Sequence, residues 1–348
     1  MGAGRKMVYK IIELAINKGL QDMQEDLQRG VRRLVDLGSV FATGNHQRDF
    51  LRKAKNIFKD ENSPYFAVLS FLINNVDPKI IKTCGLNLGY NSWTYGAAKI
   101  RTYNQAGMEN IPWFLLFDFR PKTDTVLTSK EVSAILTAGQ DIGIYCGLFF
   151  IRQESYLETL IPTLSEHRDN TFLLFVPAEL ITARLAAIIA EAANIVIVLE
   201  TSTANDNRQN KNAADAAEHL LKKKCLYGAY VFYNDHNLDY IMAHSYSKQI
   251  EELQCPFAFL IQENNDLGQK EQQFAAFLQQ ARELVPNNLF LFDFYRDLAY
   301  VNRLISAKAP FLAIKPDGTI AFNGSDSLGP YLNLKSGSLP EILQKLDS

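Results

Sequence analysis

Cysteine is scarce in this 348-residue chain, and its few copies stand far apart. The four cysteines are Cys84, Cys146, Cys225 and Cys255; no two form a CxxC pair, and no histidine completes a zinc motif with any of them. This pattern is typical of a reducing compartment and excludes a disulfide framework. We expect Cys146 and Cys255 to fall in strands and to act as small core hydrophobes.

The chain also lacks a charge excess and a long apolar run. Its 36 basic and 38 acidic residues give a net charge of −2, which offers no general attraction for nucleic acid or an anionic membrane. Lys10 and Glu13 interrupt the N-terminal apolar run, which argues against a signal peptide. The most apolar window, 178–199, contains Arg184 and Glu191 and predicts no membrane span. We therefore expect a cytoplasmic protein without a nucleic-acid partner.

Familiar catalytic motifs are missing as well. The sequence has no GxxxxGK[ST] phosphate loop, no GxGxxG after a strand and no nucleophile-elbow motif. Asp235, His236, Asp239 and His244 could be considered as metal ligands, but their spacing fits no strong pattern. A helix N-cap at Asp235 or Asn237 explains the segment more simply, so we predict no metal site.

The first third of the chain has helical periodicity. Apolar residues recur at helical spacing through 7–36, and Pro64 and Pro78 break the helices that follow. Segment 89–96, GYNSWTYG, has the composition of a turn whose Trp93 and Tyr95 could recognise a partner, although core packing is the commoner role of such aromatic residues. We predict a helical N-terminal domain over 1–110.

From Ile111 onward, short apolar runs alternate with amphipathic stretches. We expect strands at 113–118, 142–151, 171–176, 194–200, 226–233 and 255–262, and helices at 128–139, 154–167, 178–193, 212–224, 237–253 and 267–285. Thr128 and Glu131 form a capping box at the first of these helices, and Gly139 follows its expected end. Strands that are apolar throughout indicate a parallel sheet covered on both faces.

The predicted fold class is therefore α/β, with a partial (βα)6 TIM-like barrel over 111–286. A doubly wound open sheet is the alternative. The remaining segment, 287–348, contains a further apolar run, a β-hairpin around Pro316-Asp317-Gly318 and a final helix.

Five collinear stretches carry a similarity to one known group. They are VDPKIIKTCGLNLGYNSWTYGAAKIR, NIPWFLLFDF, LTAGQDIGIYCGLFF, NIVIVLETSTANDNRQNKNAADAAEHLLKKKCLYGAYVFYN and LFLFDFYRDLAYVNRLISAKAPFLAIKPDGTIAFN. Together they resemble the radical SAM superfamily, in its SPASM/twitch-type group with a helical N-terminal region. The resemblance implies a radical SAM barrel and extends over almost the whole chain.

The departures from that group concern its chemistry. Its CxxxCxxC cluster loop corresponds here to FRPKTDTV after Asp118, its GGEP motif to FIRQES, and its C-terminal cysteines to LISAKAP and IAFNGSD. Some polar positions of the group are still matched. Glu200 matches an acidic residue of the group, and Asp206 and Arg208 match its Asp-x-Arg. Since three thiolates must hold a [4Fe–4S] cluster before SAM can be cleaved, we expect no cluster, no other cofactor and no bound SAM.

The ends of the predicted strands carry a polar, mostly acidic set of residues. In a βα barrel the working residues gather at this edge, although acidic residues at helix starts give the same pattern. The candidates for a ligand site are Asp118, Arg120, Arg152, Glu154, Glu200, Asp206, Arg208, Asp235, His236 and Gln262, with Glu179 and Glu263 at the same edge.

The leading hypothesis is a non-catalytic binding or regulatory protein. Its partner would be a protein or peptide, such as an active homologue, or a small-molecule ligand at the strand ends. The alternative is an enzyme with cluster-independent chemistry, in which Glu200 or Asp118 acts as general acid or base and Arg208 or Arg152 binds an anion. A third hypothesis is an active radical SAM enzyme that borrows cysteines from a partner.

Overall fold

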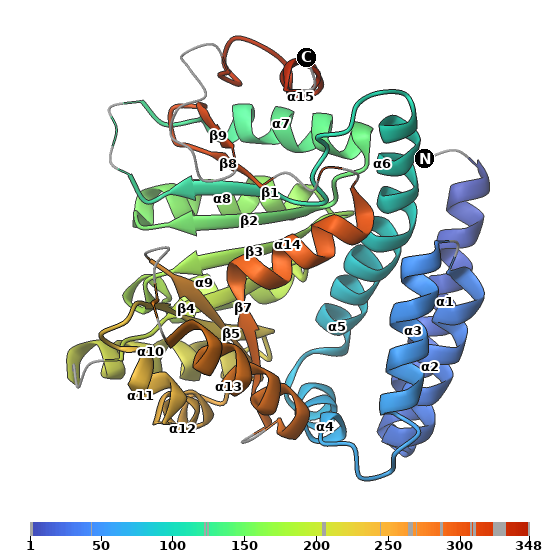
Figure 1. Cartoon of the computed structure of the whole chain (residues 1–348), viewed down its shortest axis with the longest axis vertical. Coiled ribbons are helices and arrows are strands. Elements are labelled where there is room, and N and C mark those ends of the chain that lie inside the picture. The colour runs from blue at the N-terminus through green and yellow to red at the C-terminus, as the bar shows by residue number, and fades with distance from the viewer. Residues whose placement is uncertain are drawn as a thin grey trace.

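The first third of the chain contains only helices and turns among its described residues. The computed structural model (Figure 1) describes residues 3–42, 44–121, 123, 125–203, 207–243, 245–263, 267–268, 270–285, 288–306, 308, 311–322 and 332–346. The N-terminal elements are α1 (Ala3–Glu25), α2 (Leu27–Phe41), α3 (Asn45–Ile57), α4 (Tyr65–Asn75), α5 (Pro78–Cys84), the π-helix η1 (Gly85–Gly96) and α6 (Ala97–Gln105). The predicted breaks are confirmed, because α4 starts after Pro64 and α5 starts at Pro78. A domain boundary at residue 110 stays a prediction.

The predicted turn at 89–96 is wrong. It is part of η1, so helical backbone continues from Pro78 to Gln105 without a break. The backbone N–H of Ala97, directly after η1, donates to the carbonyl of Ser92, which is the five-residue step of a π-helix. The Trp93 ring contacts the Trp113 ring, which lies just before the first strand. The structure therefore shows core packing for Trp93, which was the alternative role considered for these aromatic residues.

In the described part of the chain, seven parallel strands and one hairpin form a single sheet. The strands are β1 (Leu115–Phe119), β2 (Cys146–Ile151), β3 (Thr171–Val176), β4 (Ile195–Glu200), β5 (Tyr227–Tyr233), β6 (Phe257–Gln262), β7 (Phe290–Asp293), β8 (Leu312–Ile314) and β9 (Ile320–Phe322). Their order is β7-β6-β5-β4-β3-β2-β1-β8-β9. All pairs are parallel except β8 with β9, the predicted hairpin. The six predicted βα units are present, and β7 adds a seventh strand.

Helices connect the strands on the outer side of the sheet. They are α7 (Ser129–Ile142), α8 (Glu154–Glu166), the 3-10 helix η2 (Ala178–Leu180), α9 (Ala183–Ala192), α10 (Asn207–Lys222), α11 (Leu238–Met242), α12 (Ser245–Glu252) and α13 (Lys270–Leu284). The Thr128–Glu131 capping box is confirmed. The predicted end at Gly139 is wrong, because α7 continues to Ile142 and the left-handed Gly143 ends it. The single helix expected at 237–253 is two helices, α11 and α12.

The helix that follows β7 lies on the other face of the sheet, which we call the inner face. After β7, α14 (Phe294–Ile305) crosses in front of the strands in Figure 1 and approaches α6. Its far end is fixed near the start of β1, where the Trp113 backbone N–H donates to Asn302 Oδ1 at 3.3 Å. The chain closes with α15 (Leu339–Lys345), which packs against α7.

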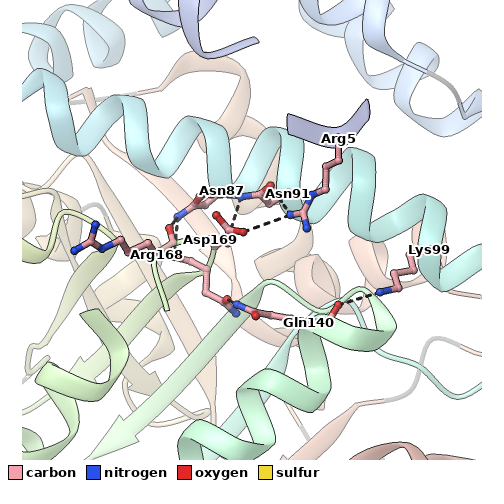
Figure 2. A network of polar contacts seen from close by, with 8 residues as sticks. Arg5, Asn87, Asn91, Lys99, Gln140, Arg168 and Asp169 are labelled. Atoms are coloured by element: carbon pink, nitrogen blue, oxygen red, sulfur yellow. Dashed lines mark hydrogen bonds and ion pairs between the residues drawn. The ribbon is translucent and has the colours of Figure 1, made fainter. Parts of the chain in front are cut away.

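A buried polar network joins the N-terminal helices to the barrel (Figure 2). Asn87 Nδ2 donates to two carbonyls of the 168–170 loop, each at 2.8 Å, and Asn91 Nδ2 donates to a third at 3.1 Å. Arg5 of α1 donates to Asn91 Oδ1 at 3.2 Å and pairs with Asp169 at 3.5 Å. Both amides are almost fully buried, so these bonds fix how η1 sits on the sheet.

No helix in the described part of the chain combines the length and the apolar character that a membrane span requires.

A close backbone contact between η1 and the end of α7 gives a test of this docking. A Cβ added at Gly96 would lie 2.2 Å from the Gly143 carbonyl oxygen, whereas a Cβ at Gly89 would meet nothing within 4 Å. We expect Gly96→Ala to lower the free energy of unfolding by about 1–3 kcal/mol. Gly89→Ala, in the same helix, is expected to leave it unchanged or raise it by up to about 1 kcal/mol. Urea unfolding measures both, and equal effects would contradict the contact.

Candidate functional site at the carboxyl edge of the sheet

The carboxyl ends of the parallel strands bring several predicted residues to one edge, which we call the mouth. Asp118 lies in β1 and Arg120 directly follows it, while Arg152 follows β2 and Glu200 ends β4. In the register of the sheet, Asp118 of β1 stands beside Phe150 of β2. The structure therefore places these four charged residues at one edge of the sheet, and their role as a ligand site stays a prediction.

The four charged residues form two ion pairs. Arg120 donates to both carboxylate oxygens of Asp118, at 2.7 and 2.8 Å. Arg152 donates to both oxygens of Glu200, at 2.6 and 2.8 Å. Such two-pronged pairing occupies both oxygens of each carboxylate with guanidinium donors. Asp118 and Glu200 are thus engaged by guanidinium groups, which does not favour either as a general acid or base.

Packed aromatic rings fill the inner face below these ion pairs. Phe150 stacks on Phe175 with 4.6 Å between ring centroids, and both rings contact Tyr230. Phe294 of α14 meets Phe150 and Phe175 edge-on, and it is fully buried. Arg120 lies over this layer, 4.7 Å from the centroid of the Phe150 ring. The inner face is therefore a packed core at this level.

The sequence analysis missed these aromatic residues as part of the mouth. Tyr230 stands beside Glu200 in the register of β4 and β5. Burial, with the Glu200 carboxylate next to it, holds the pKa of Tyr230 well above its ordinary value, so its phenol stays neutral. The sequence spacing could have predicted this position for Phe150. Phe150 lies two residues before Arg152, and alternate residues of a strand point to the same face of the sheet.

The two ion pairs contain none of the other predicted residues that the structure describes. Gln262 ends β6, half-buried, and accepts from the Tyr233 hydroxyl at 3.5 Å. Glu154, Glu179, Arg208, Asp235 and His236 are exposed at helix starts or in turns near the strand ends. Glu263 accepts a hydrogen bond from Asn234 Nδ2 at 3.0 Å. Asp206 and His244 lie outside the described residues.

The segment considered as a metal site has a structural role. Asn237 is the N-cap residue of α11, as one of the two predicted alternatives had it, and Asp239 pairs with Lys270 at 2.8 Å. Among the residues that the structure describes, no group of three histidine, cysteine, aspartate or glutamate side chains is placed to hold a metal ion.

The four cysteines lie at the edge of the sheet opposite the mouth. Cys146 begins β2, Cys225 and Cys255 stand two residues before β5 and β6, and Cys84 Sγ lies 3.9 Å from the carbonyl of Ala193, just before β4. All four are buried, and burial raises the pKa values of Cys84, Cys146 and Cys225 to about 12. Such thiols are poor metal ligands because the thiolate is the ligating form. The donor set therefore does not fit a [4Fe–4S] cluster at the mouth.

Comparison with known proteins finds solved structures of similar fold. No family model matches the chain, and no curated protein matches it. Among solved structures, Streptococcus suis SuiB bound to S-adenosylmethionine has a TM-score of 0.52 at 14% identity, over 89% of this chain and 81% of SuiB. SuiB bound to its precursor peptide SuiA has a TM-score of 0.52 at 12% identity, over 72% of this chain and 69% of SuiB.

This chain has the fold of a radical SAM barrel. The resemblance predicted from the sequence is thus confirmed at the level of the fold.

The packing of α14 on the inner face predicts a large difference between two positions of that helix. Phe294→Ala removes a fully buried ring and should lower the free energy of unfolding by about 3–5 kcal/mol. Tyr300, on the same helix, is 49% exposed, so Tyr300→Ala should change it by less than about 0.5 kcal/mol. Chemical denaturation of the two variants checks this, and similar midpoints would show that α14 does not pack on the sheet.

Proposed function

We propose that this chain is a radical-SAM-like binding protein that engages a protein or peptide partner at the mouth and does not cleave SAM. The observation that carries the proposal is the position of the thiols. A cluster with an open iron site requires three thiolates at one place, and all four cysteines of this chain are buried at the far edge of the sheet.

The condition of the mouth supports binding over catalysis. Both oxygens of Asp118 and of Glu200 are held by arginine, and the space beneath them is filled by aromatic rings such as Phe150 and Phe294. Among the described residues, the inner face directly beneath the ion pairs is thus filled by side chains. This arrangement does leave charge at the surface, since the Arg152 side chain is 40% exposed.

A macromolecular partner suits such a surface better than a small metabolite. Charged groups at the rim of an interface steer association and suppress wrong partners, whereas metabolites bind in concave, mostly apolar pockets. SuiB, which shares the fold, has been solved with a precursor peptide bound. A peptide, or an active homologue that handles one, is therefore the partner class we propose.

Anaerobic reconstitution with iron and sulfide tests the absence of a cluster. We expect iron well below one cluster per chain, no charge-transfer band in the visible spectrum and no 5′-deoxyadenosine from SAM under reducing conditions. SAM should not shift the melting curve, although a ligand at a hundred times its Kd would add about 2.7 kcal/mol of stability. Stoichiometric iron together with 5′-deoxyadenosine would refute the proposal.

Charge reversal at the rim tests where the partner binds. A partner that co-purifies with the tagged chain should bind Arg152→Glu at least tenfold more weakly, measured with both components purified. Arg184→Glu is the matched control, because Arg184 also forms an exposed ion pair, with Glu158, but lies on the outer helix α9. Equal loss of binding in the two variants would place the partner elsewhere or show a general charge effect.

A further inference from the structure

A hollow lies away from the mouth, between the N-terminal helices and the helices α13 and α14. It has a volume of about 700 Å³ and lies between α3–α4 and α13–α14. Its walls are largely apolar and include Ile57, Tyr65 and Leu278. The Tyr65 hydroxyl donates to the carbonyl of Arg282 at 2.8 Å, which joins α4 to the end of α13 beside it in Figure 1. We call this hollow the helix cleft.

Carboxylates outnumber cations in the helix cleft. Its lining contains two guanidinium groups and four carboxylates, and these residues are Arg282, Arg296, Asp60, Glu283, Asp293 and Asp297. One of the guanidinium groups, Arg296, also donates to Glu271 at 2.6 Å. The apolar cleft therefore has an excess of negative charge.

Asp293 is the most unusual of these carboxylates because it is only 4% exposed. Its Oδ1 accepts from the Arg296 backbone N–H at 3.1 Å and caps α14. Its Oδ2 is buried and accepts no hydrogen bond in the described structure, with Arg296 Nε 3.4 Å away as a loose ion pair. Burial raises the pKa of Asp293, as expected for a carboxylate whose charge is poorly compensated.

Asp297 is the partly exposed neighbour of Asp293, and its carboxylate could accept a hydrogen bond from a ligand in the helix cleft. Its Oδ2 accepts from Arg282 at 2.6 Å and from the Asp293 backbone N–H at 2.8 Å. No hydrogen bond from a described residue reaches its Oδ1, and 29% of the side chain is exposed. A cation in the helix cleft could thus contact Asp297 directly and offset the charge of Asp293 behind it.

We propose that the helix cleft binds an alkylammonium group, which is carried either by a lysine side chain of a peptide or by a free organic amine. The ammonium group contacts Asp297 Oδ1, and the methylene stem lies against Tyr65, Ile57 and Leu278. Lysine-like stems cover apolar surface while their charged heads seek an acceptor, so both halves of the ligand match the lining. The site is independent of the mouth, because Phe294 of α14 faces the inner face and Asp293 faces the cleft.

Titration calorimetry of the full chain tests the ligand class. The probes are n-hexylammonium chloride, with 1-hexanol as the neutral control, and acetyl-Ala-Leu-Lys-Leu-Ala-amide, with Gln for Lys as its control. We expect saturable binding of the cationic probes and none of the controls. A peptide at least tenfold tighter than hexylammonium would identify the lysine source, and equal or weaker peptide binding would identify a free amine. Binding of the neutral controls, or of no probe, would overturn the proposal.

Variants of α13 locate the binding. Ala275 lines the cleft and Ala276 beside it does not, and both are exposed, so Ala275→Trp fills the cleft and Ala276→Trp is its matched control. We expect at least a tenfold loss of affinity in the first and none in the second. Equal affinity in the two variants would overturn the assignment.

A charge variant tests the acceptor. Asp297→Asn should weaken hexylammonium at least tenfold, provided that its circular dichroism spectrum matches that of the wild type. Unchanged affinity in a folded Asp297→Asn variant would overturn the role of Asp297. Because this variant also loses the ion pair with Arg282, the Ala275→Trp result stands as a test that leaves every charge in place.

Discussion

Two arginine forks over a layer of packed aromatic rings determine what the mouth of this barrel can do. The ion pairs of Arg120 with Asp118 and of Arg152 with Glu200 place charge at the strand ends, and Tyr230 lies beneath both pairs. The two arginine side chains are more than a third exposed, so solvent weakens both pairs, while their two-pronged geometry fixes how the side chains are oriented. The mouth is therefore a charged surface above packed aromatic rings. That combination is the basis of the binding role that we propose.

The junction between the N-terminal helices and the barrel depends on buried hydrogen bonds between uncharged groups. Here the side chains of Asn87 and Asn91 satisfy backbone carbonyls that the 168–170 loop leaves without partners. Buried amides are costly unless they are fully hydrogen-bonded, so they allow only one docked position of η1. The same docking positions α3 and α4 beside α13 and creates the helix cleft between segments far apart in the sequence.

Much of the barrel could be predicted from the sequence because its signals are local. Short apolar runs located the strands, and the Thr128–Glu131 pair located a helix start, since both depend on neighbouring residues. Segment 89–96 was misjudged because its glycines suggest a turn, whereas tertiary packing of Trp93 keeps the backbone helical. Periodicity also did not reveal that Gly143, not Gly139, ends α7.

The candidate site was predictable only in part. Asp118 and Glu200 could be placed at one edge, because parallel strands share their carboxyl ends. Their pairing with arginines could not be predicted, since it depends on the distances between strands. The helix cleft could not be foreseen at all: Tyr65 and Arg282, which meet there, are 217 residues apart.

The hairpin has a consequence for the shape of the barrel. A strand has only two lateral rows of backbone donors and acceptors, and β1 uses one row for β2 and the other for β8. With both flanks of β1 taken, β7 cannot pair with β1 to complete a cylinder. The sheet therefore ends at β7 on one side and at the C-terminal strand β9 on the other, and α14 crosses its inner face from the end of β7 to the start of β1.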